Sequence, residues 1–192
     1  MRKSCIPPIA ISLVVLVLLA AGCKEGNPIS GTISPASASF VEESPPAGVT
    51  DHTVEFKTSF VDGGRITLDV VITEIDEPIT GVAMKLTYPD AFSKFVSCTD
   101  GSLFPAGPCF FDEPASGSGE VFIGRAVTGA AQATEVSGSQ VVVRLEFLVF
   151  GGGEGMIRIE GQNLGGGDAS AVLDVNGDPV FVQWYSGMLQ GT

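Results

Sequence analysis

Few residues in this 192-residue sequence could carry out chemistry on a bound molecule, and histidine is the scarcest of them. His52 is the single histidine, so a Ser-His-Asp arrangement would depend on it alone. No Gly-x-Ser-x-Gly stretch of the kind that holds a hydrolase nucleophile occurs. The 22 acidic residues could supply a glycosidase-type carboxylate pair, but most acidic side chains are solvated surface charges. The sequence therefore predicts a protein that is not an enzyme.

The N-terminus has the three parts of a secretory signal. Arg2 and Lys3 are basic, residues 9–21 are apolar apart from Ser12, and small residues then lead into Cys23. As a helix the apolar stretch would span about 20 Å, which is less than the roughly 30 Å hydrocarbon core of a bilayer. We therefore predict that residues 1–22 are a signal peptide and not a permanent membrane anchor.

Cys23 makes this prediction more specific. The run Leu19-Ala-Ala-Gly-Cys23 resembles the lipobox of bacterial lipoproteins, in which the cysteine thiol takes a diacylglyceryl group before cleavage. The resemblance implies lipidation of Cys23, and several acyl chains would hold the protein on a membrane where one would not. Lys24 follows the cysteine, which by the same resemblance favours the outer membrane or cell surface. An ordinary signal peptide with a nearby cysteine is the alternative.

The remaining cysteine pair, Cys98 and Cys109, lies in the part of the chain expected to be exported. Exported proteins meet an oxidising environment, so an even pair of cysteines predicts a disulfide. Such a bond would close a short loop rich in glycine and proline and stabilise the fold by about 3 kcal/mol. Two cysteines and one histidine are too few ligands for structural zinc, and no metal site of that kind is expected.

Asp174, Asn176 and Asp178 carry carboxylate or amide oxygens at alternate positions, and such oxygens could bind a metal ion. This spacing resembles the start of a calcium loop, although Tyr185 stands where the closing carboxylate of an EF-hand would be. Asn-Gly between two strands is also the strongest signal for a tight hairpin turn. We expect a plain turn, with a weak calcium site as the alternative and no other cofactor.

Composition divides the chain and excludes one class of function. The net charge is −12, and loss of the signal peptide would make it more negative by removing two basic residues and no acidic one. Because an acidic surface repels the phosphates of nucleic acid, binding to nucleic acid is excluded. Residues 23–50 are rich in proline, glycine, serine and threonine, which predicts a flexible tether. Residues 51–192 are predicted to form one domain.

That domain shows the period-two pattern of β-strands. Alternation is clearest in residues 65–73, 81–88, 141–150, 156–160 and 180–185, and Gly- or Pro-containing turns separate the segments, including Glu77-Pro78 and Asn176-Gly177. No stretch keeps a helical period over three turns. Regularly spaced strands with such turns predict an all-β fold, a β-sandwich.

The order of these segments resembles the cohesin domain. The resemblance is carried by Gly63–Thr73, Gly81–Tyr88 with Asp90, Gly101–Phe104, Gly119–Thr128, Gly138–Phe150, Met156–Leu164 and Asp174–Asp178. It implies a jelly-roll β-sandwich of about nine strands, as in cohesins and related carbohydrate-binding modules. It also implies a non-catalytic surface module that docks a partner protein, such as one bearing a dockerin.

In that family the partner site lies on one sheet face, and the resemblance places it on the strands matching 81–88, 119–127 and 141–150. Alternation then gives five candidate residues, namely Ala83, Lys85, Thr87, Arg144 and Glu146. The resemblance links this docking role to polysaccharide binding or breakdown. A direct carbohydrate-binding module and a purely structural envelope lipoprotein are the alternatives. Trp184 and Tyr185 could form a sugar-stacking platform, but a single Trp in a sandwich is more often core, and we expect these two in the core.

Overall fold

The computed structural model describes residues 36–105, 108–114, 118–128, 132–160 and 170–192. One compact unit runs from Ser34 to Thr192. The expected signal peptide and Cys23 lie outside the described residues. Within the described part, no helix is long and apolar enough to cross a membrane.

The described chain forms twelve strands, several of them only two or three residues long, against about nine expected. They are β1 (Ala38–Glu42), β2 (Thr53–Asp62), β3 (Arg65–Thr87), β4 (Ser93–Asp100), β5 (Phe110–Asp112), β6 (Glu120–Ala126), β7 (Thr134–Val149), β8 (Gly153–Glu160), β9 (Ala171–Asp174), β10 (Pro179–Val180), β11 (Gln183–Trp184) and β12 (Gly187–Gly191). The all-β prediction is confirmed.

Strand β3 is the longest element and belongs to two sheets. Its first half pairs with β2 and β7, and its second half pairs with β6, β8 and β9. The pairing register with β7 shifts between Thr73 and Ile79, and Glu74 has a φ of 42°, a conformation uncommon outside glycine. The expected turn at Glu77-Pro78 is therefore wrong, because the chain bends there through bulges and stays extended.

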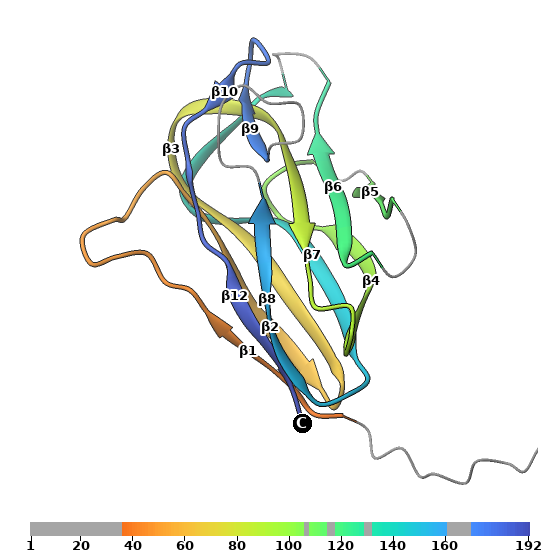
Figure 1. Cartoon of the computed structure of the whole chain (residues 1–192). Helices are drawn as coiled ribbons and strands as arrows, with labels where there is room; N and C mark the ends of the chain where they lie inside the picture. Colours follow the sequence, from red (N-terminus) through yellow and green to blue (C-terminus); the bar gives the residue numbers. More distant parts are fainter. Residues whose placement is uncertain (1–35, 106–107, 115–117, 129–131, 161–169) are drawn as a thin grey trace, which may run out of the picture. The chain divides into compact units, whose positions relative to one another are not determined.

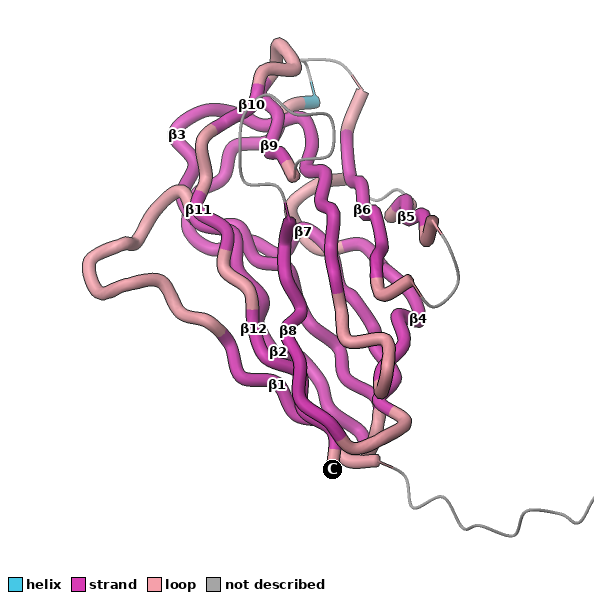
Figure 2. The backbone as a smooth tube through the Cα atoms, in the orientation of Figure 1, coloured by secondary structure: helices cyan, strands magenta, loops and turns pink. Residues whose placement is uncertain are grey.

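The two sheets pack face to face as a sandwich (Figures 1 and 2). The β7 sheet contains β4, β7, the first half of β3, β2 and β11. The β6 sheet contains β5, β6 and the second half of β3, followed by β8, β12 and β1, with β9 and β10 extending it above β8. Inward side chains of both sheets form one core, which includes Leu68, Ile72, Leu86, Ile157 and Leu189.

The domain begins earlier than the sequence indicated. Residues 38–42 form β1, which pairs along its whole length with β12, and Glu42 bonds to Lys57 with an Oε2–Nζ distance of 3.3 Å. The compact unit starts at Ser34, so the expected boundary between tether and domain at residue 51 is too late. Proline and glycine between residues 43 and 50 belong to a loop inside the domain and not to a tether.

Alternation in β7 decides which residues fill the sandwich. Alternation predicts that Val141, Val143, Leu145, Phe147 and Val149 lie inside. The last four are buried, whereas Val141 is only partly buried. Val142 was expected on the outer face but is fully buried, because the register against β3 shifts between Val70 and Val71 and leaves Val142 in a bulge.

We predict that Phe147→Ala lowers the free energy of unfolding by about 3–5 kcal/mol, since Phe147 is fully buried and contacts Phe95 and Tyr88 in the core. The matched control is Phe150→Ala, at the residue directly after β7, which removes a side chain that is 50% exposed and should cost less than about 1 kcal/mol. Urea denaturation gives both values, provided the slope with denaturant is unchanged. Equal losses in the two variants would mean that the inside and outside of β7 are assigned wrongly.

Candidate functional site

The five candidate residues from the sequence do not share one face. Lys85 and its neighbours Ala83 and Thr87 lie in the second half of β3, on the outer face of the β6 sheet, which we call the β6 face. Arg144 and Glu146 lie on β7, on the outer face of the β7 sheet, which we call the β7 face. The core separates the two faces. The sequence-based grouping is wrong because the long β3 carries its two halves into different sheets.

On the β7 face, the charged candidates are neutralised by their own sheet. Arg144 Nε lies 3.2 Å from Asp69 Oδ1 on the adjacent β3. Glu146 is ion-paired with Arg65 and also accepts a hydrogen bond from Ser97. Lys57 on β2 is also paired with carboxylates, those of Glu55 and Glu42. Burial by itself would lower the pKa of Lys57, but the hydrogen bonds and negative charge of these two residues outweigh burial and raise that pKa. Exposed ion pairs of this kind contribute about 0–1 kcal/mol each, and they leave little charge for a partner.

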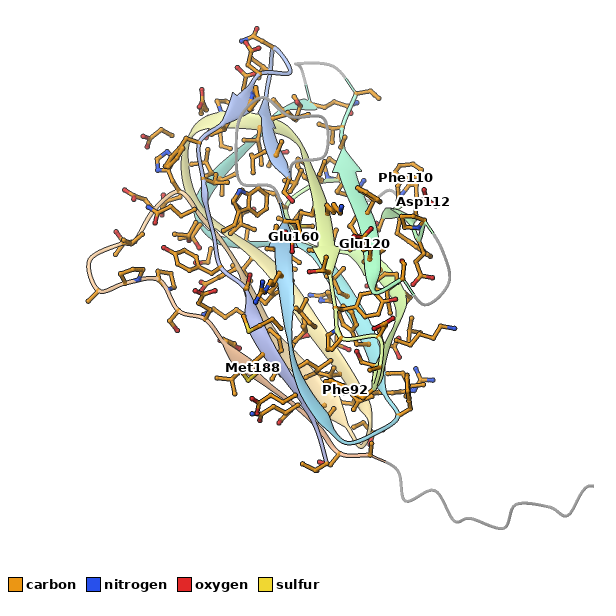
Figure 3. All side chains as sticks on the ribbon, in the orientation of Figure 1. Phe92, Phe110, Asp112, Glu120, Glu160 and Met188 are labelled. Atoms are coloured by element: carbon orange, nitrogen blue, oxygen red, sulfur yellow. A yellow bond between two sulfur atoms is a disulfide. The ribbon has the colours of Figure 1, made fainter. Side chains whose placement is uncertain are left out.

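The β6 face is wide and mixes charge with exposed apolar groups. Six strands in the order β5, β6, β3, β8, β12 and β1 span about 24 Å at the usual strand spacing. Phe110 is 64% exposed and Phe122 36% exposed at one side, and Met156 and Met188 are partly exposed neighbours at the other. Figure 3 shows Phe110, Glu120, Glu160 and Met188 distributed across this sheet.

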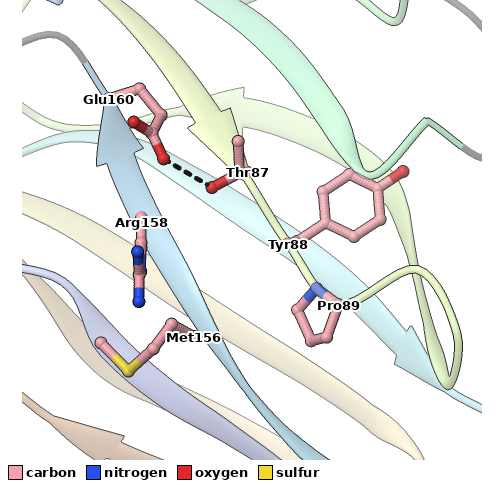
Figure 4. A pocket seen from close by; sticks show the side chains of 6 residues that line it. All are labelled: Thr87, Tyr88, Pro89, Met156, Arg158 and Glu160. Carbon is pink, nitrogen blue, oxygen red and sulfur yellow. Dashed lines mark hydrogen bonds between the residues drawn. The ribbon is translucent and has the colours of Figure 1, made fainter.

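The charged groups of the β6 face lie between these apolar zones. Lys85 Nζ is 3.5 Å from Glu120 Oε1 and 5.6 Å from the centre of the Phe122 ring. Thr87 Oγ1 donates a hydrogen bond of 3.0 Å to Glu160 Oε1. An open depression of about 260 Å³ lies beside them, lined by Thr87, Tyr88, Pro89, Met156, Arg158 and Glu160 (Figure 4).

The predicted disulfide is confirmed and positions one edge of the β6 face. Cys98 on β4 bonds to Cys109, with their Cα atoms 6.0 Å apart. Because β4 belongs to the β7 sheet, the bond joins the two sheets directly before Phe110. Phe111, the next residue of the three-residue β5, packs its ring 5.3 Å from that of Phe95 on β4. These two contacts fix the β5 edge with Phe110 outward.

The turn prediction at Asp174-Val-Asn-Gly-Asp178 is also confirmed. It joins β9 to β10, and Gly177 has a φ of 83°, which glycine adopts readily. The Asp174 carboxylate accepts 2.8 Å hydrogen bonds from the backbone N–H groups of Asp178 and Asn176, and these bonds lower its pKa. Across the described residues, no three His, Cys, Asp or Glu side chains are grouped as they would be around a metal ion.

The remaining candidates from the sequence are structural. Trp184 and Tyr185 are 7% and 8% exposed, as expected for core residues, and do not form a sugar-stacking platform. His52 has Asp76 Oδ2 3.6 Å and Asp51 Oδ1 4.0 Å from its ring nitrogens, an arrangement of surface acids around a half-buried imidazole.

Sequence reasoning missed three prominent residues of the β6 face. Phe122 and Arg158 could have been found by continuing the period-two alternation through residues 119–128 and 156–160. Phe110 could not, because β5 is too short to show a period and its orientation depends on the disulfide beside it.

Solved structures with similar folds were found, although no family model and no curated protein sequence matches this chain. The sixth cohesin of scaffoldin B from Acetivibrio cellulolyticus, in complex with a Cel5 dockerin, aligns with a TM-score of 0.54 and 16% identity, covering 71% of this chain and 96% of that one. A type I cohesin–dockerin complex from Clostridium thermocellum gives 0.54 and 15%, covering 71% and 96%. The domain has the cohesin fold.

A type II cohesin–X-dockerin complex from Acetivibrio cellulolyticus gives a TM-score of 0.51 at 14% identity, covering 69% of this chain and 91% of that one. The alignments cover nearly the whole of each of these three chains. This confirms the jelly-roll sandwich that the resemblance implied.

We predict that the pKa of Tyr88 governs stability of the cohesin-like domain at high pH. Burial of the phenol, together with the charge and hydrogen bond of Glu113, raises that pKa from 10.0 to about 12. Between these two values the unfolded chain loses the phenol proton and the folded chain keeps it, so the free energy of unfolding falls as pH rises through this range.

The test uses Tyr88→Phe, because the chain has only two tyrosines. Absorbance titration at the tyrosinate band should lose its component near pH 12 in this variant. Its stability should also fall less steeply with pH than that of the parent protein. A Tyr88 that titrates near pH 10 in the folded parent would contradict the prediction.

Proposed function

We propose that this cohesin-like domain is a non-catalytic docking module that binds a protein partner through its β6 face. The observation that carries the proposal is that one broad sheet face holds the exposed rings of Phe110 and Phe122 together with side chains of both charge signs. Partner surfaces often combine an apolar centre with polar groups in this way. A face about 24 Å wide is also large enough for the roughly 800 Å² that one partner buries in a standard interface.

The matched cohesins suggest the class of partner. Two of those structures are cohesin–dockerin complexes and a third is a cohesin bound to a Cel5 dockerin, which supports a dockerin-bearing protein as the first candidate here. The absence of exposed Trp or Tyr on the β6 face, within the described residues, favours a protein over a polysaccharide.

We predict that Phe110→Ala weakens partner binding about tenfold or more, since exposed aromatic anchors dominate interface energies. The chain from Lys24 onward would be tested by calorimetry against a panel of dockerin modules and against proteins exported by the source organism. The matched control is Phe60→Ala, because Phe60 is 59% exposed but lies on β2, on the β7 face.

Arg144→Glu is a second control, since Arg144 also lies on the β7 face. Both controls should bind normally and keep their melting temperatures. Binding that survives Phe110→Ala and is lost in Arg144→Glu would place the partner on the opposite face.

We further propose that lipid on Cys23 holds the domain at the cell surface, on the outer membrane of a Gram-negative cell. The support is the basic, apolar and small-residue order of residues 1–22 and the cysteine that ends it. Residues 24–33, which precede the compact unit, would then tether the domain to the membrane.

Cys23→Ser should release the protein from membranes and abolish labelling by a fatty-acid analogue, because the acylated thiol is lost. Cys5→Ser is the matched control, since Cys5 lies within the expected signal peptide and should not affect labelling. Fractionation followed by labelling measures both. A Cys23→Ser protein that still labels and sediments with membrane would exclude the lipid anchor.

A further inference from the structure

Arg158 is an unusual cation in this acidic chain. The described residues contain seven lysines and arginines, and five of them have a carboxylate oxygen within 4.0 Å. Of the described basic residues, Lys94 and Arg158 alone lack such an ion pair. Lys94 lies on β4 at the edge of the β7 sheet, whereas Arg158 lies on β8, on the β6 face.

The lack of an ion pair at Arg158 has a structural cause. Glu160 is two residues away on the same face of β8, but its carboxylate accepts a hydrogen bond from Thr87 on the other side. In Figure 4 the Arg158 guanidinium extends toward Met156, away from Glu160. The guanidinium thus borders the open depression of about 260 Å³ with its donors unused by neighbouring carboxylates.

Arg158 also lies well inside the face and not at its rim. Strand β8 pairs with β3 at residues 158–160 and with β12 at residues 153–157, so Arg158 lies where the two pairings meet, and β1 extends the sheet beyond β12. A partner that covers the face from Phe110 to β12 would therefore remove Arg158 from water. A desolvated guanidinium without a counter-charge is strongly unfavourable, and an anion on the partner surface is the group that offsets this cost most fully.

From these observations we propose that the depression beside Arg158 is a binding subsite for a partner carboxylate, held by the guanidinium. A planar guanidinium can donate two parallel hydrogen bonds to a carboxylate. The subsite rests on the proposed docking function and specifies it. The partner presents an aspartate or glutamate two strand spacings across the sheet and two residues along it, or about 12 Å, from the apolar group that meets Phe122.

The first experiment needs no partner. Capped aspartate (N-acetyl-aspartate N-methylamide) is titrated into the labelled chain from Lys24 onward, with capped asparagine as the uncharged comparison, and the Arg158 Nε–H and Thr87 amide signals are followed by NMR. We expect saturating shifts there and at least about fivefold tighter binding of the aspartate. Arg158→Gln should abolish them and Lys94→Gln should not. Equal shifts with capped asparagine, or loss of binding in Lys94→Gln, would overturn the subsite.

The second experiment uses a dockerin module, or another partner, that binds the parent chain in calorimetry. Arg158→Glu should weaken binding about tenfold or more, whereas Lys94→Glu, the same charge change on the other sheet, should change it less than about twofold. A partner that tolerates both variants but is lost in Phe110→Ala would overturn the carboxylate subsite and leave the docking function standing. If the chain binds capped aspartate selectively but binds no protein partner, the carboxylate subsite would stand and the docking function would be overturned.

Discussion

The whole sandwich depends on the hydrogen bonding of β3. This one strand is a neighbour of β2 and β7 in its first half and of β6, β8 and β9 in its second half. Its alternate residues, such as Leu68 and Leu86, point into the same core from opposite sheets. Because both sheets are built on a single extended segment, their separation and orientation are set by the bend between Thr73 and Ile79.

The side of the sandwich opposite β1 and β2 is held by two other interactions. The Cys98–Cys109 bond joins β4 to the residue before β5. Arg125 on β6 is 4% exposed, with its Nε 3.4 Å from Asp100 Oδ1, and it donates a hydrogen bond to the Pro105 carbonyl. A buried ion pair with such support is costly to break from one side, so it ties the chain after β4 to the β6 sheet.

These supports give the two outer faces different chemistry. On the β7 face, most charges are matched by neighbouring strands, as at Asp69 and Arg144, which suits a surface that faces water. On the β6 face, the β5 edge that the disulfide holds in place presents Phe110. Arg158, which has no ion pair within the described residues, lies on β8, away from that edge. A sheet face that carries an exposed aromatic ring and a cation without an ion pair is the better docking surface.

Local pattern in the sequence was enough to predict the all-β class, most of the longer strands, the hairpin at Asn176-Gly177 and the core positions of β7 after Val142, because alternation and turn chemistry are short-range properties. The disulfide between Cys98 and Cys109 followed from the even cysteine count of a chain expected to be exported. The sheet to which a strand belongs is not such a property. Arg144 and Lys85 have the same alternating context, yet they lie on opposite faces, because β3 bends through bulges where Glu77-Pro78 indicated a turn between two separate strands. Likewise, the sequence shows Arg158 as one cation among several, and only the tertiary pairing of Thr87 with Glu160 leaves it without a counter-charge.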